Sequence, residues 1–247
     1  MNPNERVVRT VVATLSPGAS PNVLVSAARR ESNWHADAVG DVEIARDVFL
    51  RDRAKLAANG SPYTSDADIA AWSGSFGLFQ LMAPYEVQRW RKDAHPSVLL
   101  NPIVSTILAM RKVNRIIDLG AQNAVDIRMV WAFGPDGLDI PHDDDRYVQR
   151  VESETKRWRD LGLSGSPLDP VRKFQGVGTG PTNDQAAQVA RLTSILGGKL
   201  PGGETNTTPA TKRPSVWPLV AVGAVGVVAY FAWQTSKTSR AVPVLTS

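Results

Sequence analysis

The stretch "VLVSAARRESNW", residues 23–34, places an acid on the apolar side of a predicted helix. Glu31 continues the helical stripe formed by Leu24 and by Ala27 or Ala28, at i, i+3 or i+4, and i+7. We therefore expect the Glu31 carboxyl group to face the boundary of the core. The loss of hydration there favours the protonated form, which a general acid needs near neutral pH. A glutamate at a helix end can also lie in solvent or pair with an arginine, so the stretch alone leaves both interpretations open.

The composition indicates a folded domain with appendages and excludes several kinds of site. The chain has 247 residues, of which 43% are hydrophobic and 21% are charged, and it is long enough to bury a sizeable core. It has no cysteine, which excludes disulfides, thiolate nucleophiles and cysteine-ligated zinc. Its three histidines are far apart in the sequence, and we expect no metal site and no cofactor. The net charge of +4 comes from scattered basic residues, so nucleic acid is not an expected partner.

Residues 1–162 are predicted to form one all-α domain. Apolar residues recur at helical spacing in several segments, and caps or prolines separate these segments. Asn101 and Pro102, for example, are an N-cap and a first-turn proline for a helix that ends near Gly120. No strand-like alternation is visible. The aspartates of "HDDDR", residues 142–146, could be metal ligands, but consecutive aspartates more often cap a helix, and we predict a cap.

The C-terminal part of the chain departs from this pattern. Residues 163–216 are rich in Gly, Pro, Thr, Asn and Ser and are predicted to form a flexible linker with one short helix at 184–196. The segment "WPLVAVGAVGVVAYFAW", residues 217–233, has no charge and carries aromatic residues at both ends, which is typical of a single transmembrane helix. A buried core helix is the alternative. Residues 234–247 form a short polar tail, and basic residues on both sides of the span leave its orientation open.

A second stretch, "GSFGLFQLMAPY" at residues 74–85, puts two glycines and Gln80 among large apolar side chains. Glycine lets the backbone approach a ligand or the acid, and the Gln80 amide can both donate and accept hydrogen bonds. Together with Glu31 and Ser32, this stretch resembles the lytic transglycosylase branch of the lysozyme-like superfamily. The family pattern is a helix-ending Glu-Ser, then Gly-x-x-Gly-Leu-Met-Gln, then Ala-Tyr-Asn and a late tyrosine.

The resemblance covers roughly residues 20–160 and consists of four short motifs in the family's order. Phe79 stands in the place of the family's methionine. The stretch "VWAFGPDG" corresponds to Ala-Tyr-Asn, with Phe133 matching the tyrosine and Gly134 replacing the asparagine. Tyr147 matches the late tyrosine. The resemblance implies a lysozyme-like helical fold, and the loss of the asparagine removes an expected sugar contact.

The segment of residues 41–73 is longer than is usual in that family. It includes an amphipathic stretch, which predicts an extra helix and loop over the cleft. The family's serine that bonds the acid falls near Ala71. Either Ser73 or Ser75 must take that role, or the role is vacant.

The resemblance also implies a substrate and a mechanism, with Glu31 as the single catalytic acid. Glu31 would give a proton to the oxygen between N-acetylmuramic acid and N-acetylglucosamine in peptidoglycan, and the substrate's acetamido group would support the resulting cation. The deprotonated Glu31 would then take a proton from the sugar's 6-hydroxyl, which leaves a 1,6-anhydro product. Ser75, Gln80, Phe133 and Tyr147 would line the glycan groove.

Three other functions remain open, and one of them is that of an unrelated subunit of a membrane complex. A muramidase that uses water needs a second carboxylate roughly 5 to 9.5 Å from the first, and Asp37, Asp41 and Glu43 are the nearest candidates in sequence. A non-catalytic structural or glycan-binding protein could keep the same fold.

The N-terminal stretch has two arginines inside its only apolar patch and no run long enough for a signal-peptide core, so we do not expect ordinary secretion. We therefore expect an enzyme anchored in a lipid membrane by its C-terminal helix, in a phage particle or in the host cell envelope. Other virion membrane proteins are expected partners. Its role would be to open the cell wall locally while the genome is delivered.

Overall fold

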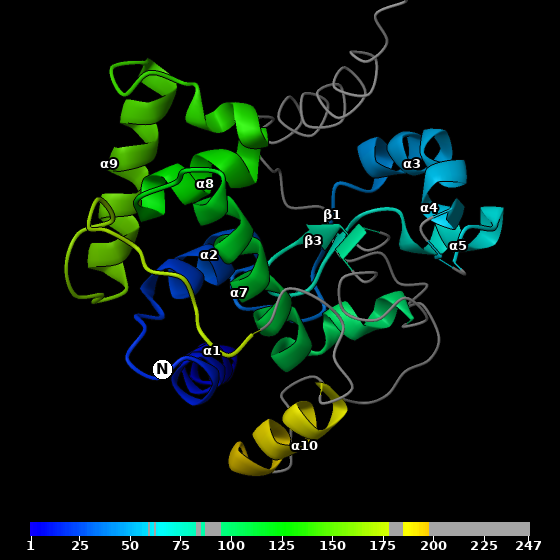
Figure 1. The fold of residues 1–247 in the computed structure, drawn as a ribbon, viewed down its shortest axis with the longest axis horizontal. Helices are drawn as coiled ribbons and strands as arrows, with labels where there is room; N and C mark the ends of the chain where they lie inside the picture. The colour runs from blue at the N-terminus through cyan, green and yellow to red at the C-terminus, as the bar shows by residue number, and fades with distance from the viewer. Residues whose placement is uncertain (59, 62, 83–84, 87–94, 178–184, 198–247) are drawn as a thin grey trace, which may run out of the picture.

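The computed structural model describes residues 1–58, 60–61, 63–82, 85–86, 95–177 and 185–197, and this part of the chain is mostly helical (Figure 1). Its helices are α1 (Pro3–Leu15), α2 (Asn22–Ser32), α3 (Val42–Arg51), α4 (Arg53–Ala58), α5 (Asp66–Trp72), α7 (Pro102–Asp118), α8 (Ala124–Phe133), α9 (Asp145–Asp160) and α10 (Gln185–Ile195), with two short 3₁₀ helices, η1 (Pro96–Leu100) and η2 (Pro135–Leu138).

Helix starts follow the capping residues that the sequence predicts. The side chain of Asn101 accepts hydrogen bonds from the backbone N–H groups of the first turn of α7, at 2.9 Å from Ile103 and 3.3 Å from Val104. The cap predicted within residues 142–146 is confirmed, because the Asp144 carboxylate accepts the backbone N–H of Arg146 at 2.8 Å. These caps provide an acceptor for backbone N–H groups that would otherwise be unpaired, and they set where α7 and α9 begin.

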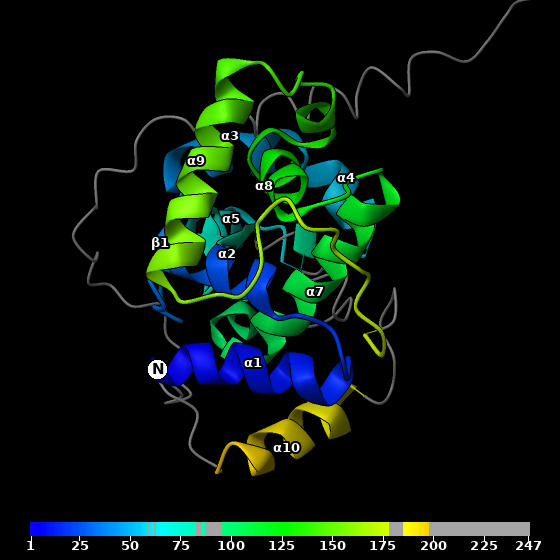
Figure 2. The same ribbon diagram turned by 90° about the vertical axis from the view of Figure 1, so that its left-hand side faces the viewer.

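Helix α7 is the central element of the helical part. Helices α1, α2, α8 and α10 all pack against it, and nearly its whole length is buried, including Ile103, Ile107 and Met110, which are fully inaccessible. Figure 2 shows α1 and α10 side by side below α7. A helix that is apolar on most of its faces must be surrounded by other elements, and α7 meets that condition.

Three short strands follow α2 and form an antiparallel sheet in the order β1 (Val39–Gly40), β2 (Ser75–Phe76) and β3 (Leu81–Met82). Val39 pairs with Phe76, and Ser75 pairs with Met82. Figure 1 shows this sheet between the main group of helices and the group α3, α4 and α5. The all-α prediction missed the sheet because strands of two residues are too short to produce an alternating pattern.

The long segment between β1 and β2 is a small helical unit with its own core. Helices α3, α4 and α5 contribute Phe49, Leu56 and Ile69, each almost completely buried, and Tyr85 packs against them. The Tyr85 hydroxyl donates to the carboxylate of Asp52 at 2.6 Å. The insertion is thus three helices where the sequence predicted one helix and a loop, since α4 and α5 are too short to show a clear period.

The predicted linker begins too early, because residues 163–177 lie against the helical domain. Phe174 and Val177 are 3% exposed, and their carbonyl oxygens accept hydrogen bonds from α7, from Asn114 at 2.8 Å and Arg111 at 2.7 Å. The helix predicted at 184–196 is present as α10, which buries Leu192 fully. Composition suggested a flexible segment, but a few apolar anchors are enough to bind it to the core.

None of the described helices is long and apolar enough to span a bilayer. The predicted transmembrane segment, residues 217–233, and the polar tail at 234–247 lie outside the described residues.

Candidate active site

Glu31 lies in the last turn of α2, where the chain turns toward the sheet. Asn33 and Trp34, which follow the helix, both have left-handed backbone conformations, with φ of 51° and 72°. The Asn33 N–H closes the helix on the carbonyl of Arg29, and the Trp34 carbonyl accepts a hydrogen bond from the Asn4 side chain at 2.7 Å. This tight turn fixes the end of α2. The Glu31 side chain in its last turn is 20% exposed.

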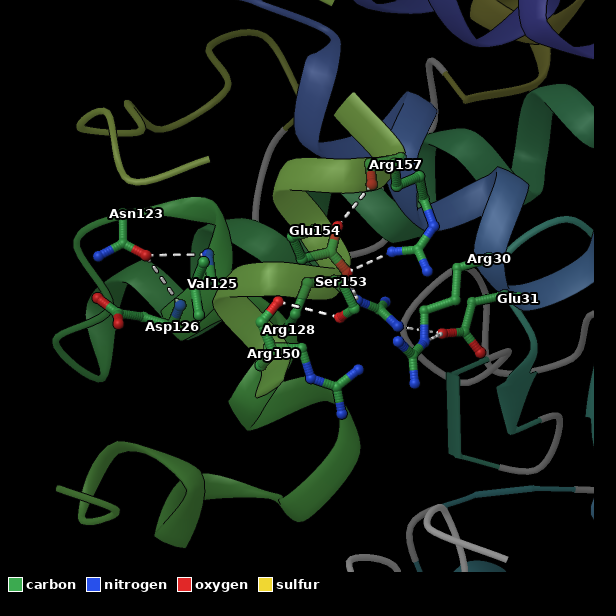
Figure 3. A network of polar contacts seen from close by, with 11 residues as sticks. Arg30, Glu31, Asn123, Val125, Asp126, Arg128, Arg150, Ser153, Glu154 and Arg157 are labelled. Carbon is green, nitrogen blue, oxygen red and sulfur yellow. Dashed lines mark hydrogen bonds and ion pairs between the residues drawn. The ribbon is translucent and has the colours of Figure 1, made fainter. Parts of the chain in front are cut away.

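The Glu31 carboxylate is paired with arginines. Arg128 on α8, whose side chain is 2% exposed, donates from Nη2 to Oε1 of Glu31. The Nε of Arg30 lies 3.9 Å from the same oxygen. Figure 3 shows both guanidinium groups beside the Glu31 carboxylate. Of the two interpretations that the sequence left open, the helix-end acid paired with an arginine describes the structure, and its main partner is the distant Arg128.

A second acid, Glu154 on α9, lies behind this pair and is completely buried. Its Oε1 is 2.6 Å from Nη1 of Arg157 and 3.7 Å from Nε of Arg128, and its Oε2 accepts from the Ser26 hydroxyl at 2.6 Å. Burial alone would raise the pKa of Glu154, but the charges of Arg128 and Arg157 and the Ser26 hydrogen bond outweigh burial and lower it. Glu154 is therefore a fixed negative charge that holds Arg128 in place.

An aromatic ring and a lysine complete the surroundings of Arg128. Trp131, one turn further along α8, has the Nζ of Lys112 at 4.2 Å from its ring centre and the guanidinium carbon of Arg128 at 5.5 Å. Burial is the main reason that the pKa of Lys112 is lowered to about 8, and the nearby cations Arg115 and Arg128 act in the same direction. The negative face of the ring attracts both cations.

Gln80 and Ser75 are brought together on the sheet, where they bond to each other. Ser75 Oγ lies 3.0 Å from Oε1 of Gln80 and 3.0 Å from a carboxylate oxygen of Asp41. The Gln80 Nε2 donates to the carbonyls of Ala38 and Gly77, at 3.1 and 3.0 Å. The Gln80 amide thus ties the three strands together and is held in one orientation.

The serine that the resemblance assigns to the acid is not found at Ser73 or Ser75 in the described contacts. The Ser73 hydroxyl donates to the carbonyl of Ile69 within α5. Ser75 bonds to Asp41 and Gln80. In the described part of the chain, the side chains that pair with the Glu31 carboxylate are those of Arg128 and Arg30.

Tyr147 and Phe133 belong to a different cluster. The Tyr147 hydroxyl donates to Asp126 at 3.0 Å, its ring stacks on His142 with centres 4.2 Å apart, and Phe133 packs against the same group. Burial, together with the bond to Asp126, raises the pKa of Tyr147 to about 12. Tyr147, Asp126 and His142 line a hollow of about 240 Å³ that also includes Leu138.

Helix geometry separates this hollow from Glu31. Asp126 and Arg128 are two residues apart on α8, so their side chains leave the helix in nearly opposite directions. Figure 3 shows Asp126 and Glu31 at opposite ends of the network. The structure therefore brings Ser75 and Gln80 together on the sheet, but it places Tyr147 on the other side of α8 from the Arg128–Glu31 pair.

Sequence reasoning missed Arg128 and Glu154, although a usable pattern was present. Glu154 lies on the same helical stripe as Tyr147, Val151 and Trp158, which was predicted to face the core. Arg128 interrupts the apolar run of α8 in the same way. Both are charged residues on an apolar stripe, which is the criterion that selected Glu31.

In the described ranges, no cluster of His, Asp and Glu is placed to hold a metal ion. No protein family profile, no curated protein and no solved structure matches this chain at a significant level.

Proposed function

We propose that the chain is a peptidoglycan-cleaving lytic transglycosylase in which Glu31 is the catalytic acid and base. Glu31 protonates the glycosidic oxygen between N-acetylmuramic acid and N-acetylglucosamine, and the neighbouring acetamido group supports the cationic centre. The carboxylate then removes a proton from the 6-hydroxyl, which closes a 1,6-anhydro ring. One carboxyl group performs both proton transfers, and no metal or cofactor takes part.

The observation that carries the proposal is the placement of Glu31. It is a mostly buried acid in the last turn of a helix that leads directly into a small antiparallel sheet bearing Gln80 and Ser75. The aromatic ring of Trp131 lies next to Arg128, the partner of Glu31. The order of these features along the chain is that of the lytic transglycosylase pattern.

The arginine pair sets a condition on this mechanism. The hydrogen bond from Arg128 stabilises the charged form of the Glu31 carboxylate, whereas the first step needs a proton on it. Glu31 must therefore exchange Arg128 for a proton from solvent when substrate binds. The proton taken from the 6-hydroxyl in the second step restores the acid, and Glu31 gives it back to solvent when the product leaves and the bond to Arg128 forms again.

The substitution Glu31→Gln tests the assignment. We expect it to lower the rate of glycan release from purified cell walls by about 10²- to 10⁴-fold, the usual contribution of general acid–base catalysis. Mass spectrometry of the released muropeptides should find anhydro-muramyl ends for the wild-type chain. These ends are lighter by one water than hydrolysed ends.

The matched control is Glu152→Gln, which changes an exposed glutamate on α9. It should leave the release of muropeptides unchanged. Equal activity of the Glu31→Gln variant and the wild type would remove Glu31 from the mechanism. If neither form releases glycan, a binding or structural role replaces the enzyme.

A muramidase is the second candidate, because the structure holds a second carboxylate on the sheet. The Ser75 hydroxyl bonds to Asp41 at 3.0 Å, directly after β1. An acid fixed there could activate water in a hydrolytic reaction. If the chain is a muramidase, its products carry reducing ends and the Asp41→Asn variant releases no glycan. If it is a lytic transglycosylase, the same variant still forms the anhydro product.

The proposal includes the location of the enzyme. Residues 217–233, outside the described part, have the composition of a membrane anchor, and residues between α10 and this segment would tether the catalytic domain to it. Such an arrangement suits an enzyme of a phage particle that opens the wall locally during genome delivery. Recovery of the chain in the membrane fraction, and its loss from that fraction on deletion of 217–247, tests the anchor.

A further inference from the structure

The network around Glu31 contains more positive than negative charge. We call it the arginine cluster, and it holds four guanidinium groups and two carboxylates: Arg30, Arg128, Arg150 and Arg157 with Glu31 and Glu154. Three of these six groups are buried: Arg128, Arg150 and Glu154 are 2%, 6% and 0% exposed. Buried charges of one sign destabilise a fold unless an opposite charge accompanies them.

Three of the guanidinium groups converge. Figure 3 shows Arg30, Arg128 and Arg150, which come from α2, α8 and α9, pointing toward one another. Burial, and then the positive charge of Arg30 and Arg128, lowers the pKa of Arg150 to about 9. Burial and Arg128 likewise lower the pKa of Arg30 to about 10. Burial is the main cause of both shifts, and the repulsion between the guanidinium groups adds to it.

Two buried donors point into this region without a protein acceptor. Among the described residues, Nη1 of Arg128 and Nη1 of Arg150 have no hydrogen-bond partner. The buried acid closest to them, Glu154, already receives Arg157 and Ser26. A buried N–H group of a guanidinium that lacks an acceptor is unfavourable, and the usual solution is a bound anion or water.

The cluster opens toward solvent on one side. The Arg30 side chain is 32% exposed and the Glu31 side chain is 20% exposed, whereas Arg128 and Arg150 lie beneath them. Arg30 is therefore the member of these three arginines that an anion in solvent can contact directly.

We propose that Arg30, Arg128 and Arg150 form a binding site for an oxyanion, either a carboxylate or a phosphate group, beside the proposed catalytic acid. The planar guanidinium group offers paired N–H donors whose spacing matches the oxygens of these two groups. A bound oxyanion accepts hydrogen bonds from the two unpaired N–H groups, and its negative charge offsets part of the excess positive charge of the arginine cluster. It also competes with Glu31 for Arg128.

Two sources can supply such a group. One is free phosphate. The other is a carboxylate of the glycan, such as the lactyl group of N-acetylmuramic acid, and this source rests on the proposed function. In the second case the substrate itself draws Arg128 away from Glu31 and so leaves the acid free to take up a proton.

Isothermal titration of the full chain, at constant ionic strength, tests the site. The ligands are inorganic phosphate, acetate and N-acetylmuramic acid, with N-acetylglucosamine as the sugar that lacks the carboxylate. We expect the wild type to bind phosphate and Arg150→Gln to bind it at least about tenfold more weakly, since a charge-assisted hydrogen bond is lost. Arg159→Gln, which changes an exposed arginine on the same helix, should bind phosphate like the wild type.

The ligands separate the two sources. The site is assigned to the substrate carboxylate if N-acetylmuramic acid binds in competition with phosphate and N-acetylglucosamine does not bind. Binding of phosphate alone assigns it to a free anion. Because titration requires no turnover, an inactive chain that still binds the oxyanion contradicts the proposed function and leaves the site standing.

Two results would overturn the proposal: no binding of either oxyanion class by the wild type, or equal binding of phosphate by Arg150→Gln and the wild type. If Arg150→Gln does not fold, Arg30→Gln at the exposed rim replaces it and should weaken binding in the same direction.

Discussion

At the scale of single residues, Glu31, Arg128 and Glu154 come from three different helices and compensate one another's charge. Arg128 bonds to Glu31 and lies 3.7 Å from Glu154, and both acids are more than three-quarters buried. Removal of one member of such a group leaves an uncompensated charge, which typically destabilises a fold by about 3–5 kcal/mol. We therefore expect Arg128 to matter for folding as well as for the acid.

Lys112 provides a test of burial at the same scale. Its pKa is lowered from 10.5 to about 8, so the folded chain releases this proton at a lower pH than the unfolded chain does. Between these two pH values the unfolded chain binds more protons, and stability rises with pH. We expect the free energy of unfolding of the wild type, relative to Lys112→Met, to increase by roughly 1–3 kcal/mol from pH 8 to 10.5.

Denaturant unfolding at several pH values measures this difference. Lys156→Met, at a lysine that is 74% exposed, is the control for the loss of a lysine from a helix. A difference between the wild type and Lys112→Met that stays constant over that pH range would show that folding does not lower the pKa of Lys112.

At the scale of elements, the turn between β2 and β3 depends on Gly77. Its φ is +76°, and a Cβ atom there would lie 2.1 Å from the carbonyl oxygen of Leu99, which is itself fully buried. The N–H of Gly77 donates to Ala38, and its carbonyl receives the Gln80 amide. This glycine thus joins the sheet, Gln80 and the start of α7 at one point.

Gly77→Ala should lower the stability by more than the strain of placing alanine in a left-handed backbone conformation. Gly162, with φ of +61° and no atom within 4 Å of a built Cβ, is the matched control. Gly162→Ala pays only the left-handed strain, about 1–2 kcal/mol. We expect Gly77→Ala to cost at least about 2 kcal/mol more in the free energy of unfolding; equal losses in the two variants would contradict the close approach to Leu99.

At the scale of the whole molecule, residues 163–177 belong to the folded domain. The segment runs from the end of α9 across the domain and ends against α7. Its backbone bonds to Ala124, the first residue of α8, and the N–H of Val171 donates to the chain just before that helix. The N–H of Gln175 also bonds to Ser16 after α1 at 2.8 Å. It therefore joins the first and the middle helices of the chain.

Phe174→Ala tests this role. Phe174 is 3% exposed, and loss of a buried phenylalanine typically costs about 3–5 kcal/mol. Leu168→Ala, at a residue that is 47% exposed in the same segment, should change the stability by less than about 1 kcal/mol. Similar small losses for both variants, measured by denaturant unfolding, would mean that the segment is only loosely attached.

Local chemistry made much of the helical architecture predictable. The caps at Asn101 and in the aspartate cluster and the apolar stripe of α2 depend on residues within one or two turns, so the sequence shows them directly. The placement of Glu31 at the end of α2 follows from the same local pattern. The sheet did not, because its strands are only two residues long and the pairing of β1 with β2 joins residues more than thirty positions apart.

The sequence by itself determined the helices, the position of Glu31 in its helix and the presence of charged residues on apolar stripes. Only the tertiary structure decided that Arg128 and Glu154 surround that acid, and that Tyr147 bonds to Asp126 on the other side of α8. The physical reason is range. Helix formation depends on neighbours three or four residues away, whereas the partner of a buried charge depends on how helices separated by about a hundred residues pack.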